Sequence, residues 1–313
     1  MNILFNKTGV NASSEFKALM GFIDVDIKFQ NIKSDVLSAT REVVDVVGRD
    51  IYNIAFNAYQ SGNAEKESLI YHFQLPIAIN AYRMYAPNND IAHTGNGRKM
   101  RKTDNETVPF EWMIDRDNEA LERKYYRALD ELIRFLEETE PDWLQSEAYK
   151  KLQQSIFKTT DAFDEFFVID SRLLLIKLQP GIRQCLQNDI KPRIGAEKLQ
   201  LLLAENISPD LEELAFVVKA ACAYYALSWA MPRLSVNLFP KGIIQGYVAE
   251  QQTTQAKSVA DGNSLAFAKQ YFENDYRQYL ARIEEIIKKS LPADESDDDF
   301  LEDFITGKNF IST

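Results

Sequence analysis

The stretch Phe110–Glu138, FEWMIDRDNEALERKYYRALDELIRFLEE, decides the fold class of this chain. Its apolar residues recur every three or four positions, which is the period of a helix that buries one face. These residues are Leu121, Tyr125, Leu129, Leu132 and Leu136. Pro141 follows at a place where a helix can stop. The sequence therefore predicts one long amphipathic helix here.

The composition favours a helical chain with a substantial core. Of the 313 residues, 45% are hydrophobic, whereas 12 are Gly and 10 are Pro. A low content of turn-forming residues favours long helices over a sandwich of many short strands. The predicted fold class is all-α, and the length is sufficient for two domains.

Most of the predicted elements occur twice along the chain. Segments of the second half match segments of the first at a nearly constant shift of 146 residues (Asp170 against Asp24). The matched pairs are Val168-Ile169-Asp170 with Phe22-Ile23-Asp24, Leu178 with Ile32, Ile182 with Val36, Ile190 with Val44, Gly195 with Gly48 after one inserted residue, and, at the larger shift of 151, Tyr276–Leu280 with Tyr125–Leu129. Because the matches keep their order, the sequence predicts a tandem duplication of one helical domain.

The duplication sets the predicted domain boundaries. We expect two helical-bundle domains, with a linker between them and a segment outside each. The segments are a flexible arm at 1–14, domain 1 at 15–140, the linker at 141–161, domain 2 at 162–292 and an acidic tail at 293–313. Phe166–Leu178 leaves a choice between helix and strand, and its leucines ahead of a helical pattern favour the helix.

The charge of the chain is concentrated in the tail. The formal net charge is −11, and the tail holds seven acidic residues and one base, Lys308. The rest is mildly acidic, which argues against non-specific binding to nucleic acid. No apolar run is long enough for a membrane span, and the start of the chain lacks the pattern of a signal peptide. We therefore expect a protein made in the cytoplasm, without a membrane partner.

The sequence shows no pattern typical of a catalytic or metal site. Cys185 and Cys222 have neither a disulfide framework nor ligand spacing, and His72 and His93 lack the helical partner of a zinc motif. A G-x-S-x-G elbow is also missing. We expect no cofactor, no metal and no catalytic residue. An enzyme stays as a third hypothesis, which requires a cleft that joins a histidine to a carboxylate or a thiol.

A basic cluster follows the glycines of Thr94–Gly97. Glycine loops can bind phosphate, but the spacing of a P-loop is missing here, and acidic residues lie nearby. The corresponding loop of the second half keeps one lysine in the turn Phe239–Gly242. The residues predicted to contact a partner protein in these two loops are Arg98, Lys99, Arg101, Lys102 and Lys241.

The acidic tail also carries apolar residues, which a merely solvated tail would not need. They include Phe300, Leu301, Phe304 and Ile305, interleaved with the acids. This pattern predicts a docking segment that becomes ordered against another subunit or a neighbouring protein. Docking of the tail onto the second domain of its own chain is the alternative.

The run Thr94–Lys99 followed by Phe110–Ala120, together with the turn Phe239–Gly242, resembles an uncharacterised protein family of Bacteroidetes genomes that is often found in prophage-like regions. The resemblance implies a virion part, such as a head–tail connector or adaptor, that is incorporated into a particle and contacts phage structural proteins. It transfers no catalytic residue.

We therefore expect a non-enzymatic structural or assembly protein that acts through contacts with other protein subunits, and a homo-oligomer stays open. The alternative is a soluble binding or regulatory module with a ligand site between the two repeats. An apolar cleft with convergent polar groups between the halves would favour that alternative.

Overall fold

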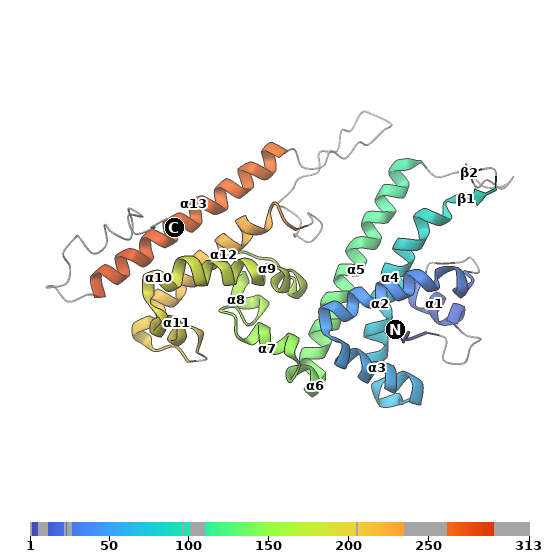
Figure 1. Ribbon diagram of the computed structural model, residues 1–313, viewed down its shortest axis with the longest axis horizontal. Coiled ribbons are helices and arrows are strands. Elements are labelled where there is room, and N and C mark those ends of the chain that lie inside the picture. The colour runs from blue at the N-terminus through green and yellow to red at the C-terminus, as the bar shows by residue number, and fades with distance from the viewer. Residues whose placement is uncertain are drawn as a thin grey trace, which may run out of the picture.

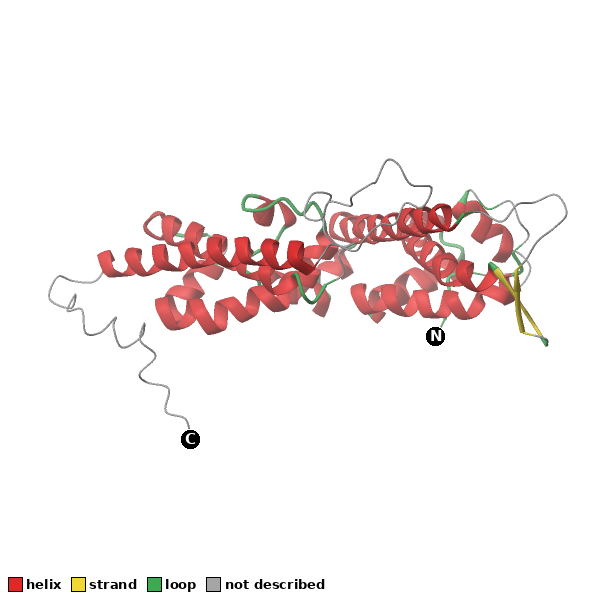
Figure 2. Ribbon diagram, turned by 90° about the horizontal axis from the view of Figure 1, so that it is seen from above, coloured by secondary structure: helices red, strands yellow, loops and turns green. Residues whose placement is uncertain are grey.

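The computed structural model describes residues 2–5, 12–21, 23, 27–95, 97–100, 110–204, 206–234 and 262–290. Helices dominate this part of the chain and form two halves, which lie side by side along the long axis of the molecule (Figures 1 and 2). The predicted all-α class with two helical repeats is confirmed. None of the described helices is both long and apolar enough to cross a membrane.

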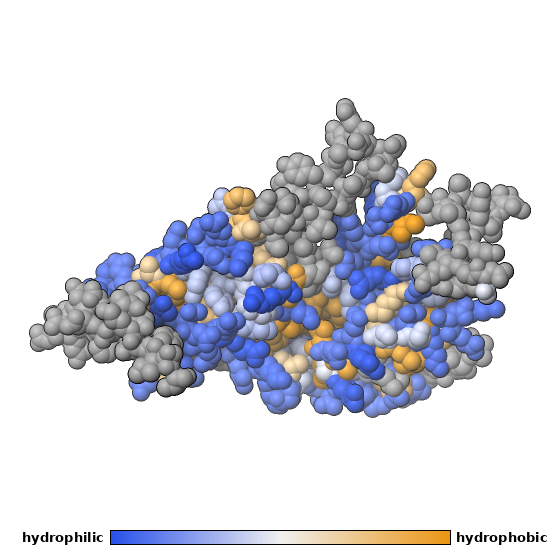
Figure 3. All heavy atoms as spheres, turned by 45° about the horizontal axis from the view of Figure 1, so that its top comes forward, coloured by the Kyte–Doolittle hydropathy of each residue, from blue (hydrophilic) through white to orange (hydrophobic). Residues whose placement is uncertain are grey.

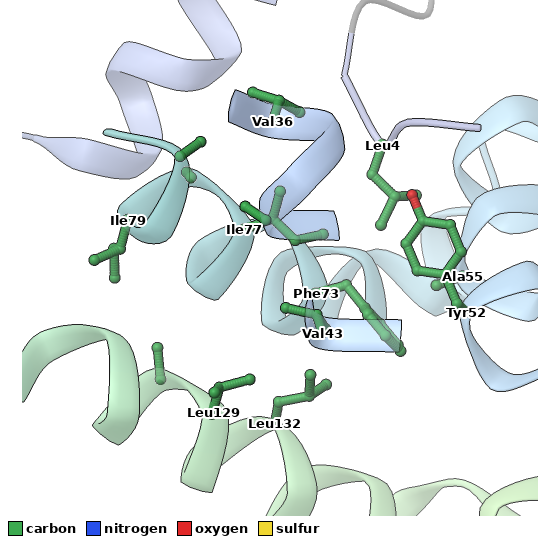
Figure 4. Close-up of a cluster of buried hydrophobic side chains, with 14 of the residues drawn as sticks. Leu4, Val36, Val43, Tyr52, Ala55, Phe73, Ile77, Ile79, Leu129 and Leu132 are labelled. Carbon is green, nitrogen blue, oxygen red and sulfur yellow. The ribbon is translucent and has the colours of Figure 1, made fainter. Parts of the chain in front are cut away.

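The first half is built around one central helix, α4. Its elements are α1 (Ala12–Met20), α2 (Phe29–Val47), α3 (Arg49–Ser61), η1 (Ala64–Lys66), α4 (Glu67–Asn89) and α5 (Glu111–Thr139). α4 packs between α2 and α5. Phe73 and Ile77 of α4 face Val43 of α2 and Leu132 of α5, and all four side chains are buried (Figure 4). Burial of such side chains is the main favourable contribution to folding.

The second half repeats this arrangement around α12. Its elements are α6 (Pro141–Leu144), α7 (Glu147–Gln153), α8 (Thr160–Asp164), α9 (Arg172–Cys185), η2 (Leu186–Ile190), α10 (Lys191–Ile194), α11 (Ala196–Leu203), η3 (Pro209–Leu211), α12 (Glu212–Ala230) and α13 (Gly262–Ser290). α12 packs between α9 and α13, as α4 does between α2 and α5. The halves have separate cores, and Trp143 of α6 belongs to the first.

Two glycines show the duplication at the level of the backbone. Gly48 ends α2 with φ +89° and ψ 153°, and Gly195 ends α10 with φ +82° and ψ 160°. In this region of backbone space a side chain is strained, so glycine is favoured. Each glycine is followed at once by the next helix, α3 or α11. The same corner therefore occurs in both halves.

A π-turn accounts for the single residue inserted before Gly195 in the second repeat. The helix that continues from α9 contains the π-turn η2, Leu186–Ile190, whereas α2 is α-helical throughout. A π-turn takes up one extra residue without breaking a helix. It moves Ile190 into register with Val43 rather than Val44, and both Ile190 and Val43 are fully buried. The register of the repeat thus changes within the π-turn.

Three local details differ from the expectations. A hairpin of β1 (Ile91–Thr94) and β2 (Gly97–Met100) lies in the region expected to be a loop. A two-residue Gly-Asn connection between two short runs is typical of a hairpin, so the prediction of a loop was wrong here. Phe166–Leu178 becomes helical only from Arg172 onward, because Ser171 caps the helix through the N–H of Leu174.

The third difference lies at the N-terminus. Leu4 and Phe5 are buried in the first core, although they belong to the expected flexible arm. The Tyr52 hydroxyl donates to the carbonyl of Asn2 at 2.8 Å, and the Gln74 side-chain amide donates to the carbonyl of Leu4. These contacts attach residues 2–5 to α3 and α4.

Candidate partner-binding surface

The residues predicted from sequence to bind a partner lie at the margins of the described structure or outside it. Arg98 and Lys99 belong to β2, and their side chains are not described. The others lie outside the described residues: Arg101, Lys102, Lys241, Phe300, Leu301, Phe304 and Ile305. All of these site assignments stay predictions.

The described residues reveal a different surface, which becomes visible when α5 is compared with α13. α5 buries one face in the first core through seven residues: Leu121, Tyr125, Ala128, Leu129, Leu132, Ile133 and Leu136. It also contacts α9 of the second half, so a second face of the helix is covered (Figure 1).

The second face of α5 holds the first turn of α9. The carboxylate of Asp130 accepts hydrogen bonds from the Leu173 N–H at 2.7 Å and from the Ser171 hydroxyl at 3.0 Å. A carboxylate at the start of a helix is favoured, because free N–H groups point at it. Burial raises the pKa of Asp130, and the hydrogen bonds from Leu173 and Ser171 oppose that rise.

An ion pair and an apolar contact complete this joint between the halves. Arg172 is 8% exposed and donates to Glu137 Oε1 through Nε at 2.9 Å and Nη2 at 2.7 Å. Leu173 is buried in the core of the first half rather than in that of its own half. The joint therefore combines a capped helix end, a charge pair and an inserted leucine.

The matching face of α13 lacks both carboxylates of the joint. In the alignment of Tyr276–Leu280 with the first repeat, Ala281 takes the place of Asp130. Lys288 takes the place of Glu137. Alanine cannot accept the hydrogen bonds of a helix start, and lysine reverses the charge at the position of the ion pair. α13 therefore cannot hold a neighbouring helix in the way that α5 does.

The outer side of α13 is basic toward its C-terminal end. Four cations are exposed there, and at about 100° per residue they lie within a sector of about 140°, on the side opposite the buried Ile283. Within residues 276–290, Glu285 is the exposed acid, and it pairs with Lys289 at 2.7 Å. We call the four exposed cations the basic face: Arg277, Arg282, Lys288 and Lys289.

α13 is also less buried than α5. Among its residues whose burial is described, Phe272 and Ile283 are buried. On the same side as the basic face, Phe267 is 64% exposed and Tyr271 is 69% exposed. Figure 1 shows α13 along the outer edge of the second half, and Figure 3 shows apolar residues as separate groups on a largely hydrophilic surface. α13 thus offers both charge and aromatic area for contact.

A polar cluster fixes α5 where it leaves the first core. Arg83 of α4 donates to Glu122 at 3.0 Å and to the Asn80 side chain at 3.1 Å. Asn80 and the Tyr125 hydroxyl both donate to Glu42, at 2.7 and 3.2 Å. Burial raises the pKa of Tyr125, and the Glu42 carboxylate adds to the rise. The cluster joins α2, α4 and α5.

The second half keeps this cluster in weaker form. At the equivalent positions, Tyr276 is hydrogen-bonded to Asp189, and the Ser228 hydroxyl donates to Glu273 at 3.4 Å. Serine replaces Arg83 here, so the short ion pair of the first half becomes a long hydrogen bond. Burial is the main cause that raises the pKa of Tyr276. Both repeats thus position their last helix through equivalent residues.

A second exposed apolar region lies at the start of α5. Phe110 is 69% exposed and Met113 is 44% exposed. Asp117, one turn further on, adds to the raised pKa of Asp90, for which burial is the first cause. Single exposed apolar residues are common, so these two extend the candidate surface but do not define it.

The residues considered for chemistry have structural contacts. The His72 ring stacks on Phe135 with centroids 4.1 Å apart, and its Nδ1 lies 2.7 Å from the Ser68 carbonyl oxygen. Cys185 and Cys222 are buried in the second core, where burial raises the pKa of the Cys222 thiol. Within the described ranges, no group of three or more potential metal ligands comes together.

An open pocket of about 150 Å³ lies within the second half rather than between the halves. Its lining includes Ile156, Leu202, Ile207 and Lys219. The sequence-based alternative of a ligand site between the repeats therefore gains no support from this pocket.

Sequence comparison places the chain in a family. The family of unknown function DUF6712 matches residues 42–153 and again residues 178–292. The two matches cover well over half of the chain, so the protein belongs to this family, and each match includes the central helix of one half. No curated protein and no solved structure matches the chain.

Proposed function

We propose that this DUF6712 protein is a non-enzymatic structural or assembly protein, of connector or adaptor type, that works through protein–protein contacts. One observation carries the proposal. The face of α5 that holds a neighbouring repeat has a counterpart on α13, and there cations of the basic face and two aromatic residues are exposed. A helix face used for docking in one repeat is a natural docking face in the other.

The chemistry of the face supports a protein partner. Arginine and aromatic residues are enriched in protein interfaces, and both occur on α13. Phe267 and Tyr271 are exposed one helical turn apart, on the side of the helix that also carries Arg282. A partner with acidic and apolar groups would match this surface in charge and in shape.

The phage-type setting rests on the resemblance of residues 94–120 to proteins of prophage-like regions, and it implies incorporation into a particle. The test is mass spectrometry of particles purified from the source strain after induction. Recovery of the protein at a fixed ratio to the main capsid protein is expected. Its absence from particles, together with abundance in the remaining cell fraction, would contradict the proposal.

A matched pair of variants tests the proposed surface. Arg277→Glu with Arg282→Glu reverses two charges of the basic face, whereas Arg123→Glu with Arg127→Glu reverses two exposed charges on α5. Incorporation into particles should fall for the first pair and stay unchanged for the second. An equal effect of both pairs would show that net charge, rather than this face, determines incorporation.

A further inference from the structure

We propose that the basic face of α13, with Phe267 and Tyr271, is the docking surface for the acidic C-terminal tail of the same chain. The inference builds on the proposed docking role of this face and names what occupies it in the isolated protein. The joint between the halves provides a template for this contact within the same molecule.

In the first repeat, the chain that follows α5 folds back onto α5. It leaves the helix after Thr139 and returns at Ser171–Leu173, where Arg172 pairs with Glu137. In the second repeat, the chain that follows α13 is the tail. The position of Glu137 is then occupied by Lys288, and the returning chain is acidic instead of carrying a cation. The charges of helix and returning chain are both reversed at this position, so their attraction is preserved.

The position of Asp130 also changes in a way that suits the tail. The carboxylate of Asp130 holds the N–H groups of a helix start, and Ala281 replaces it with a small exposed side chain. A carboxylate here would repel an acidic segment, whereas alanine neither repels it nor blocks its approach. The flanking cations Arg277 and Arg282 then dominate the charge of this part of the helix, because Glu285, one turn further on, is paired with Lys289.

The order of residues along the tail matches the order along α13. From its C-terminal end backward, α13 presents the four cations of the basic face, Lys289 first and Arg277 last, and then Tyr271 and Phe267. From its start forward, the tail presents five acids (Asp294, Glu295 and Asp297–Asp299) and then Phe300, Leu301, Phe304 and Ile305, with Glu302 and Asp303 between the two apolar pairs. An antiparallel tail would set acids beside cations and apolar residues beside exposed aromatic rings.

The lengths of the two segments agree. An extended chain from Leu291 to Phe300 spans roughly 30 Å. The helix from Lys288 back to Tyr271 spans roughly 26 Å. Pro292 lies two residues beyond Ser290, the last residue of α13, and proline disfavours the continuation of a helix.

Connection within one chain favours the tail of the same molecule over that of a second copy. A short flexible link gives an effective concentration in the millimolar range, which exceeds ordinary protein concentrations. The contact combines exposed charges with aromatic rings, so we expect it to weaken as salt is added. A partner that uses this face would then have to displace the tail.

The test uses the full chain with a nitroxide on Ser296→Cys. Cys185 and Cys222 are fully buried, so the new thiol is labelled selectively. Paramagnetic broadening of amide signals is expected at residues 277–288 of α13 and not at residues 126–137 of α5. It should be lost in Arg277→Glu/Arg282→Glu and retained in Arg123→Glu/Arg127→Glu, with melting temperatures measured for every variant.

Two results would overturn the inference. One is an α13 without broadening in the parent protein. The other is broadening that appears only when nitroxide-labelled chains are mixed with isotope-labelled chains, because this would assign the tail to a second copy. Either result would leave the proposed assembly role intact, since recovery from particles tests that role separately.

Discussion

α5 and α13 are equivalent helices with different surroundings. Both span 29 residues and pack against the central helix of their half. α5 is covered on two faces, because it also holds the first turn of α9, whereas α13 lies at the outer edge of its half (Figure 1). One helix design therefore serves two purposes. Two carboxylates on the second face of α5 join the repeats, and an alanine and a lysine at the same positions leave that face of α13 exposed.

The largest expected effect comes from the buried leucine and isoleucine at equivalent positions. Leu132→Ala removes a fully buried side chain of α5 and should lower the free energy of unfolding by about 2–5 kcal/mol. Ile283→Ala at the matching position of α13 should lower it by about 2 kcal/mol, because the less covered helix can relax around the cavity. Urea unfolding followed by circular dichroism measures both. A larger loss for Ile283→Ala would show that α13 is packed at least as tightly as α5.

The next effect tests the ion pair of the joint. Arg172→Ala leaves Glu137 without its partner and should cost about 1–3 kcal/mol, since the arginine is buried and the carboxylate is partly exposed. The control is Arg134→Ala, which breaks an exposed pair with Glu131 on the same helix and should cost under about 0.5 kcal/mol. Thermal unfolding of both variants provides the measurement. Equal losses would mean that the pair contributes nothing specific to the joint.

A smaller loss of stability is expected when the polar clusters of the two halves are disrupted, and it should differ between them. Arg83→Met removes the hydrogen bonds to Glu122 and Asn80 and should destabilise the protein by about 1–2 kcal/mol. Ser228→Ala removes the 3.4 Å bond to Glu273 and should cost under about 0.5 kcal/mol. Chemical denaturation ranks the two variants. The reverse order would show that the second cluster is the stronger one.

The smallest expected effect concerns pH. Because the pKa of Asp130 is raised in the folded protein, ionisation of this carboxyl lowers stability. The stability that the protonated Asp130 carboxyl provides is fully present below pH 3.8, which is its ordinary pKa. This stability is lost as the pH rises through the pKa of the folded protein. Relative to Asp130→Asn, the parent protein should therefore become less stable to unfolding as the pH rises from about 3 to about 7. A shift in favour of the parent would show that the hydrogen bonds outweigh burial.

The periodicity of the sequence was sufficient to predict the helices and their duplication. Apolar residues at helical spacing identified α5 to within one residue at each end, and Gly48 and Gly195 marked the same corner in both halves. Residues 2–5 were missed, because the burial of Leu4 and Phe5 depends on α3 and α4, which are distant in sequence. The π-turn was indicated only by the single inserted residue.

The candidate surface was harder to predict than the fold. Taken alone, Ala281 and Lys288 are typical of an ordinary solvated helix face. Their significance depends on the contacts that the equivalent residues of α5 make in the other repeat. The signal was present in the aligned repeats, where these two residues correspond to Asp130 and Glu137. Its meaning came from the hydrogen bonds of the joint, which no local pattern contains.

Hydrogen exchange of the full chain, followed peptide by peptide, measures how well each of the two helices is covered. α5 is held by packed helices on two faces, whereas α13 packs on a helix with one face and meets only the proposed, salt-sensitive tail with the other. Amides of α13 between residues 272 and 288 should therefore exchange faster than those of α5 between residues 121 and 137. Equal protection of the two helices, or slower exchange in α13, would contradict the account and would show that α13 is as fully covered as α5.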